Sequence, residues 1–328
     1  MTVINNIEID NINYVRNETK MAIQNNEPIE NKLNVIIVIS NPCLYAKRYI
    51  LAKEFIRRME DEEHVNLYIV ELVYGDQKFI LTSKNNKSHL QLKTTTPLWH
   101  KENMINLGVK YLLPKDYKAF AWVDADVDFD SSTWALDTLK ILNGYKDVVQ
   151  LFSHCVDMNK IGETMNVFSS FGYNFEKNKK YSTKGFDYWH PGYAWAITRK
   201  AYEKIGGLYE KSILGSGDNI MALSLINKCD KMTNVKYSAD FNGDMFNYQK
   251  KMQNLRLGYV PGIIHHHYHG SKVNRRYVER TKVLIDHQYS PLTQIKYDNI
   301  GVIIPNDSFS LDFKNDIMSY FKERKEDD

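Results

Sequence analysis

Apolar runs with the length and composition of buried strands alternate along this chain with segments whose apolar residues recur at helical spacing. The run LNVIIVIS at Leu33–Ser40 predicts a buried strand, and the segment from Tyr45 to Met59 predicts a helix that starts near Asn41-Pro42, an N-cap and N1 pair. Further strands are expected at 65–73, 89–95, 118–124, 147–151 and 259–265, and further helices at 100–113, 131–142, 198–206, 218–228, 273–285 and 311–324. The alternation predicts an α/β fold with one mostly parallel central sheet, helices on both faces and a Rossmann-like nucleotide-binding half.

The length allows two domains, but one large α/β domain accounts for the pattern. We expect an N-terminal extension at 1–33, a main domain at 34–285, and a C-terminal tail and helix at 286–328 that packs on it. Within the main domain, 155–189 shows little periodicity, so we expect a long loop there, part of which closes over a ligand. Ser131 or Ser132 is expected to cap the helix that follows it, and Thr198 the helix that ends at Gly206.

The composition of the chain indicates which classes of binding partner and which cellular compartment to expect. The 328 residues include 43 Lys and Arg and 40 Asp and Glu, interspersed, for a net charge of +3, which gives no case for a nucleic-acid partner. No apolar stretch approaches the ~20 residues of a membrane helix, and the polar N-terminus lacks a signal-peptide core. The 3 cysteines have no metal-ligand spacing and indicate reduced thiols. We therefore expect a soluble, cytoplasmic protein without a transmembrane segment.

An acidic D-x-D motif follows the apolar strand expected at 118–124. Asp124 and Asp126 would lie at the carboxyl end of that strand, where open α/β sheets bind ligands, and paired carboxylates there suit Mg²⁺ or Mn²⁺ with bound phosphates. A solvated acidic turn is the alternative. A calcium loop starting at Asp124 is excluded, because its sixth residue is Phe129 and its twelfth Ala135.

Four histidines stand within five residues at His265–His269, followed by Lys272, Arg275 and Arg276. Imidazoles at alternate positions of a strand share one face, and imidazole suits Mn²⁺ better than Ca²⁺. The basic residues can neutralise a diphosphate. Surface histidines at a strand end, beside a basic helix face, are the alternative, and the spacing leaves open which histidines bind metal.

A glycine-rich segment leads into the helix expected at 218–228. In Gly215-Ser-Gly217-Asp218 the glycines allow close approach to a ligand, and Asp218 at the helix start could accept a proton from a hydroxyl nucleophile. The alternative is a carboxylate that only stabilises the first turn of the helix.

Taken in order, these segments resemble the C-terminal region of the β-1,4-galactosyltransferases and of related uncharacterised bacterial and viral glycosyltransferases. The likeness rests on Lys101-Glu-Asn-Met-Ile-Asn106-Leu-Gly, the D-x-D motif, His190-Pro-Gly-Tyr-Ala-Trp195, the segment ending at Asp218, and His269-Gly-Ser-Lys272. The chain departs from that family where an acidic pair becomes Gly217-Asp218-Asn219, which keeps one carboxylate.

The resemblance implies a GT-A-type glycosyltransferase of the hexosyltransferase class. It would use Mn²⁺ or Mg²⁺ to move a sugar, with inversion, from a nucleotide-sugar donor such as a UDP-sugar to a hydroxyl acceptor such as a glycan. By the same resemblance Asp218 is the general base. The expected donor-binding residues are Lys101, Asn106, Asp124, Arg275 and Trp195, and the expected metal ligands are Asp124, Asp126, His267 and His269. A non-catalytic carbohydrate- or nucleotide-binding relic of the same fold and a haloacid-dehalogenase-like phosphatase are the alternatives, although the phosphatase motif normally lies on the first strand.

Overall fold

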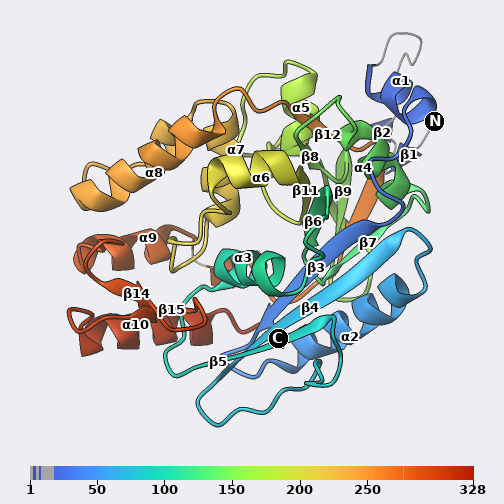
Figure 1. The fold of residues 1–328 in the computed structure, drawn as a ribbon. Coiled ribbons are helices and arrows are strands. Elements are labelled where there is room, and N and C mark those ends of the chain that lie inside the picture. Colours follow the sequence, from blue (N-terminus) through green and yellow to red (C-terminus); the bar gives the residue numbers. More distant parts are fainter. Residues whose placement is uncertain (1–2, 5–6, 9–17, 276) are drawn as a thin grey trace.

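A computed structural model describes residues 3–4, 7–8, 18–275 and 277–328, and it centres on a seven-stranded sheet in the order β12-β8-β11-β6-β3-β4-β5 (Figure 1). Strand β11 is antiparallel to both of its neighbours, and every other pairing in this sheet is parallel. The predicted α/β fold with a mostly parallel central sheet is therefore confirmed. The strands are β3 (Leu33–Ser40), β4 (Val65–Tyr74), β5 (His89–Thr94), β6 (Ala119–Val123), β8 (Val148–Gln150), β11 (Ala194–Thr198) and β12 (Leu257–Tyr259).

Helices cover both faces of this sheet because side chains alternate along each strand. From β3, Val35 and Ile37 pack with α2 (Ala46–Glu60) and α4 (Trp134–Leu142), whereas Ile36 packs on the other face with α3 (Lys101–Tyr111). Helix α3 lies close to the sheet at Gly108, where a Cβ atom would be 3.1 Å from a methyl carbon of Ile36. The α3 side also holds α6 (Arg199–Ile205), α7 (Gly217–Leu225) and α8 (Ala239–Met252).

A second, four-stranded sheet has the order β10-β9-β13-β7. Its strands are β7 (Val127–Phe129), β9 (His154–Met158), β10 (Thr164–Ser169) and β13 (Ile263–His266). Strands β9 and β10 and the short helix α5 (Phe171–Glu176) lie where we expected a long loop, so that prediction is wrong for 155–176. Buried polar residues such as His154 and Asp157 break the apolar pattern of β9, and the Ser170 hydroxyl caps α5 by accepting from Tyr173 N at 3.1 Å.

The ends of some elements also differ from the prediction. Thr198 caps α6, and Gly206 ends it at φ 74°, both as predicted. In contrast, α2 begins at Ala46, because the Asn41 side chain instead accepts from Tyr45 N at 2.9 Å in the preceding turn. Helix α4 begins after Thr133 rather than after Ser131 or Ser132, the strand expected at 259–265 divides into β12 and β13, and α8 has no counterpart among the predicted helices.

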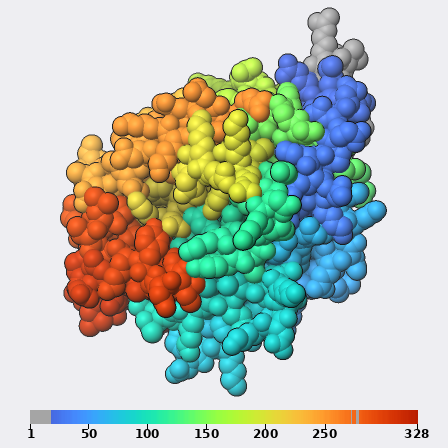
Figure 2. Space-filling view, viewed as in Figure 1, coloured from blue at the N-terminus to red at the C-terminus, as the bar shows by residue number. Residues whose placement is uncertain are grey.

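The C-terminal part of the chain packs against α3. Figure 2 shows its red surface beside the teal surface of the residues around 100, and Asn103 Nδ2 donates to the Gly301 carbonyl at 3.0 Å. This part contains α9 (Tyr277–Asp286), β14 (Ile295–Tyr297), β15 (Ile303–Pro305) and α10 (Leu311–Glu323). Beyond α10, the Asp327 carboxylate accepts from Ala46 N and Lys47 N at 3.0 and 2.8 Å, so the last residues cap α2.

Near the other end of the chain, α1 (Glu18–Asn25) lies against α4, and Asn26 Nδ2 donates to the Lys140 carbonyl at 3.1 Å. The remaining elements are the strand pair β1 (Val3–Ile4) and β2 (Ile7–Glu8) and the 3₁₀ turns Cys229–Lys231 and Lys272–Arg275. Among the described residues, no helix has both the length and the apolar character needed to span a membrane.

Candidate functional site

A cavity of about 530 Å³ opens at the carboxyl ends of β3 and β6. This is the edge at which open α/β sheets bind ligands. Charged and imidazole side chains from segments far apart in the sequence reach it. They are Arg48, Lys101, Glu102, Asp124, Asp126, His190, Asp218, His266, His269, Arg275, Arg280, Arg324 and Glu326.

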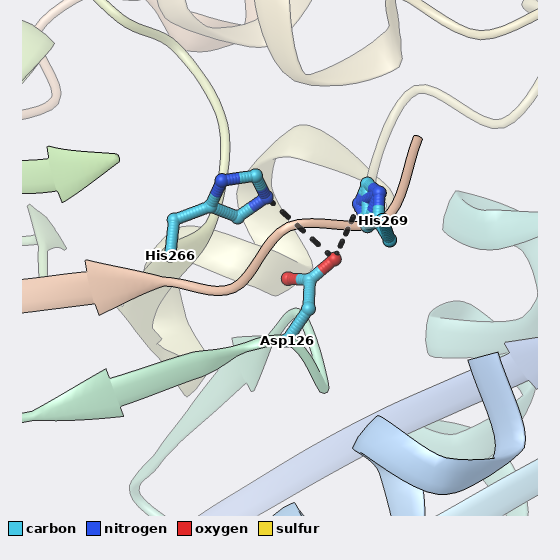
Figure 3. Close-up of side chains that lie close together, drawn as sticks. All are labelled: Asp126, His266 and His269. Atoms are coloured by element: carbon cyan, nitrogen blue, oxygen red, sulfur yellow. Dashed lines mark hydrogen bonds and ion pairs between the residues drawn. The ribbon is translucent and has the colours of Figure 1, made fainter. Parts of the chain in front are cut away.

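Three of these side chains form a group that can hold a metal ion. Asp126 follows β6, His266 ends β13, and His269 lies three residues further on, and one ligand atom of each lies within 4.8 Å of the others. Asp126 Oδ2 is 2.8 Å from His269 Nε2 and 3.8 Å from His266 Nε2. Figure 3 shows both contacts converging on this one carboxylate oxygen. The group combines one carboxylate with two imidazoles, a donor set that suits Mn²⁺ and other transition metals better than Ca²⁺.

The hydrogen bonding of the group supports a metal site. Asp126 Oδ1 and His266 Nε2 are buried and have no hydrogen-bond partner among the described residues. On its other nitrogen, His266 is held by Asp157, with Nδ1 and Oδ1 2.7 Å apart, which is how metal-binding histidines are usually oriented. The His266 ring also stacks on Tyr193 at 4.5 Å, and Tyr193 has a φ of 80°, an unusual angle for a bulky residue. His266 is thus held with Nε2 toward Asp126, where both side chains could bind one metal ion.

His269 is neutral in this setting. Burial, with the nearby Arg275 guanidinium, lowers the pKa of His269 to about 3, although Asp126 opposes the shift. A neutral imidazole keeps the lone pair that a metal requires. Arg275 Nη2 lies 3.0 Å from His269 Nδ1, so a guanidinium stands beside the group.

The alternating direction of side chains along β13 determines which of its histidines lies near Asp126. His265 and His267 point to the same side, as expected, but on that side they contact acidic residues of the β7 segment. His267 Nε2 is 2.6 Å from Asp128 Oδ2, and His265 Nε2 is 3.0 Å from Asp130 Oδ1. His266 points to the opposite face and joins Asp126. The expected ligand His267 is therefore replaced in the group by His266, whereas His269, beyond the end of the strand, lies where we expected it.

Asp124 faces a lysine rather than the metal group. Its carboxylate is paired with Lys101 Nζ, from the first turn of α3. Burial disfavours the lysine charge, but Asp124 and Asp218 outweigh this and raise the pKa of Lys101 above its ordinary value. The pair thus lines the cavity next to Asp126 but stands outside the three-residue group.

Two expected donor-binding residues do not line the cavity formed by the described residues. Trp195 is 1% exposed within β11, and its indole donates to the Pro191 carbonyl at 2.8 Å. Asn106 joins α3 to the turn after α6, because it donates to Leu208 O at 3.0 Å and accepts from Leu208 N at 2.8 Å. Both have structural roles.

Asp218 lies in the first turn of α7 and lines the cavity. The helix follows Ser216, whose φ is 77° and whose side chain makes no capping bond. Asp218 Oδ1 accepts from Asn219 N at 2.8 Å, and Oδ2 lies near Gly192, where a Cβ atom would be 3.1 Å from it. The missing side chain of Gly192 therefore leaves room at the carboxylate.

The basic wall of the cavity includes residues that the sequence did not indicate. Arg48 and Arg324 both pair with Glu326, which is 3% exposed. No role was predicted for these residues or for Glu102, because nothing in the sequence shows that α2, α3 and the C-terminus meet here, whereas His266 was among the four histidines left open as metal ligands. Of the basic residues predicted after the histidines, Arg275 reaches the cavity, whereas Arg276 and the side chain of Lys272 lie outside the described residues.

No family model matches the sequence, and no curated protein matches it. Among solved structures, the chain is similar to the catalytic domain of Drosophila beta1,4-galactosyltransferase 7 in complex with xylobiose, at 11% identity and a TM-score of 0.36, over 84% of this chain and 93% of that chain. A mutant of that protein in complex with manganese, UDP-Gal and xylobiose gives the same values.

A mannosyltransferase, PcManGT from Pyrobaculum calidifontis, in complex with GDP-Man and Mn²⁺, is similar at 12% identity and a TM-score of 0.39, over 83% of this chain and 67% of that chain. A putative glucose-1-phosphate thymidylyltransferase from Bacillus anthracis, which is not a glycosyltransferase, is similar at 8% identity and a TM-score of 0.33, over 71% of this chain and 88% of that chain. TM-scores this low carry no argument about function, which has to come from the residues of the site.

Proposed function

We propose that this protein is a metal-dependent GT-A-type glycosyltransferase that moves a hexose from a nucleotide-sugar donor to a hydroxyl group of an acceptor. The observation that carries the proposal is the group Asp126, His266 and His269, which lines the same cavity as Asp218 and in which Asp126 Oδ1 and His266 Nε2 have no hydrogen-bond partner among the described residues. In this proposal residues 34–285 are the catalytic domain, with 1–33 an extension and 286–328 a tail packed on it, and the protein acts in the cytoplasm.

Asp126, His266 and His269 would hold the ion, and the two imidazoles favour Mn²⁺ over Mg²⁺. When bound, such an ion neutralises charge on a nucleoside diphosphate and makes it a better leaving group. Arg275, beside His269, adds a guanidinium that can bind phosphate oxygens with two parallel hydrogen bonds. The donor diphosphate would therefore contact both the metal ion and Arg275.

Lys101 and Asp124 would bind the nucleoside end of the donor. The ion pair fixes the Asp124 carboxylate at the end of β6, where its second oxygen can accept from a ribose hydroxyl. The family resemblance favours UDP, and two of the matched structures hold UDP-Gal and GDP-Man, so both nucleotides serve as probes.

Asp218 would be the general base. Its carboxylate accepts the proton of the acceptor hydroxyl while that oxygen forms a bond to the anomeric carbon. The bond from this carbon to the diphosphate breaks on the opposite face, so the configuration inverts. A positioned base contributes about 10²–10⁴ in rate.

Calorimetry with UDP and GDP, with Mn²⁺ or with EDTA, tests the proposal. We expect nucleotide binding to require Mn²⁺ and to be lost in Asp126→Ala and His266→Ala. His267→Ala is the matched control, because it removes a neighbouring imidazole that contacts Asp128 instead. Binding that is indifferent to metal, or equal losses in His266→Ala and His267→Ala, would reject the metal site. A non-catalytic relic would bind in the same way but release no sugar from the donor.

A further inference from the structure

Glu102 is a buried carboxyl group in this cavity to which the proposed mechanism gives no role. It lies in the first turn of α3, next to Lys101, and is 6% exposed. Its carboxyl group lies against the first turn of α7, where a Cβ atom on Gly217 would be 2.5 Å from the Glu102 carboxyl carbon. A larger residue at 217 would therefore force the Glu102 side chain to move away from α7, one residue from Asp218.

One oxygen of this carboxyl group, Oε2, is buried and has no hydrogen-bond partner among the residues that the structure describes. Glu102 also lines the cavity. A buried polar atom left without a partner costs about 1–3 kcal/mol, so native structures rarely keep one unless a ligand or a water completes it. Because Glu102 belongs to the wall of the cavity, a ligand bound there is a candidate for that partner.

The surroundings of Glu102 decide whether it donates or accepts. Burial raises the pKa of Glu102 to about 8, and the negative charges of Asp218 and Asp124 add to the shift, whereas Lys101 opposes it. From α8, the buried Tyr248 also faces Glu102, and burial keeps its pKa well above the ordinary value, so it remains neutral. At neutral pH most Glu102 side chains are therefore protonated, and a protonated carboxyl group has an O–H to donate.

We propose that Glu102 is an acceptor-binding residue that donates a hydrogen bond to a sugar hydroxyl beside the one that Asp218 deprotonates. The inference rests on the proposed function. A neutral donor next to an anionic acceptor matches two neighbouring hydroxyl groups of a sugar, one of which gives up its proton while the other is only held. Pairs of carboxyl groups that differ in protonation divide donor and acceptor roles in this way.

Glu102→Gln keeps a neutral group that donates, whereas Glu102→Ala removes it. The probe is a panel of methyl glycosides of xylose, glucose, galactose and N-acetylglucosamine, whose binding to the protein with Mn²⁺ and UDP is measured by NMR titration. We expect the glycoside that binds to keep its affinity within about 3-fold in Glu102→Gln and to lose about 10-fold in Glu102→Ala, as for one buried hydrogen bond. UDP affinity should stay unchanged in both, and Glu54→Gln on the exposed face of α2 is the control for the same chemical change.

The pH dependence separates binding from a structural role. Glycoside affinity of the unmodified protein should fall above about pH 8, where Glu102 ionises, and this fall should be absent in Glu102→Gln. Unchanged glycoside affinity in Glu102→Ala, an equal loss of UDP affinity, or a panel that does not bind the unmodified complex would overturn the inference. Failure of UDP to bind with Mn²⁺ would instead reject the proposed function, so the two failures are distinguishable.

Discussion

Replacing Glu102 by Gln should change how the stability of the protein depends on pH, whether or not any substrate is known. Burial raises the pKa of Glu102 from 4.5 to about 8 in the folded protein, whereas in the unfolded chain the group titrates near 4.5. Below pH 4.5 both states are protonated, and Glu102 imposes no penalty. Between pH 4.5 and about pH 8 the unfolded state releases the proton whereas the folded state keeps it, so the free energy of unfolding decreases as the pH rises. Above about pH 8 both states are ionised, and the free energy of unfolding no longer depends on Glu102.

The size of this effect follows from the shift. Each pKa unit corresponds to 1.36 kcal/mol, so a shift from 4.5 to about 8 corresponds to about 5 kcal/mol between pH 4 and pH 9. At about 2 °C per kcal/mol, that is a change of roughly 10 °C in melting temperature. Glutamine does not titrate, so the melting temperature of Glu102→Gln minus that of the unmodified protein should rise with pH by this order.

Thermal melts of both proteins from pH 4.5 to 8.5 in EDTA measure the difference, and other titrating groups contribute equally to both and cancel. A constant offset between the two proteins reflects the burial of the amide and carries no information. Glu54→Gln, at an exposed position, should show no trend. A difference for Glu102→Gln that stays flat between pH 5 and 8 would refute the reasoning, because Glu102 would then ionise in the folded protein as it does in the unfolded chain.

Three further substitutions test other parts of the account. Asp218→Asn should lower turnover by about 10²–10⁴ in a donor-hydrolysis or transfer assay and leave the melting temperature and UDP affinity near normal, whereas retained turnover would remove Asp218 from the catalytic residues. Gly217→Ala should destabilise the protein by about 1–3 kcal/mol in urea unfolding, because its Cβ would lie 2.5 Å from the Glu102 carboxyl carbon, and adding Glu102→Ala should restore part of the loss. Glu326→Ala should cost about 3–5 kcal/mol, because it leaves Arg48 and Arg324 without their shared buried partner. Burial opposes the charge of Glu326, but the two arginines outweigh it and lower the pKa of Glu326, so this stability should be present at neutral pH and lost in acid, and an acid-independent effect would contradict the pairing.

The sequence predicts much of the central sheet, because β3, β4 and β6 are mostly apolar and the helices beside them are periodic, but it misses β11, the short antiparallel strand between β6 and β8. β3 and β4 are buried on both faces, so their composition alone marks them. In the second sheet only β13 overlaps a predicted strand, and β7, β9 and β10 were not predicted. His154 and Asp157 on β9 are buried polar residues, and the Asp157 carboxylate orients the His266 ring by a hydrogen bond. Local pattern and global fold disagree most at functional positions of this kind.

Only some residues of the candidate site can be predicted from the sequence, for the same physical reasons. The D-x-D motif and the histidine run mark the metal group, but which histidine faces Asp126 depends on the register of β13 against β7. A shift of one position exchanges His266 for His267. Glu102 and Glu326 gain their roles from contacts with α7 and α2, which lie more than a hundred residues away in the chain, and no local pattern records such contacts.

Release of nucleoside diphosphate from UDP- and GDP-sugars, with Mn²⁺ or with EDTA, is the most direct test of the central claim. The account predicts that at least one donor is split with Mn²⁺, that one sugar is freed or transferred for each diphosphate, and that EDTA or Asp126→Ala abolishes the reaction. Release that continues undiminished in EDTA and in Asp126→Ala, or no release from any donor by a protein that binds UDP with Mn²⁺, would contradict it.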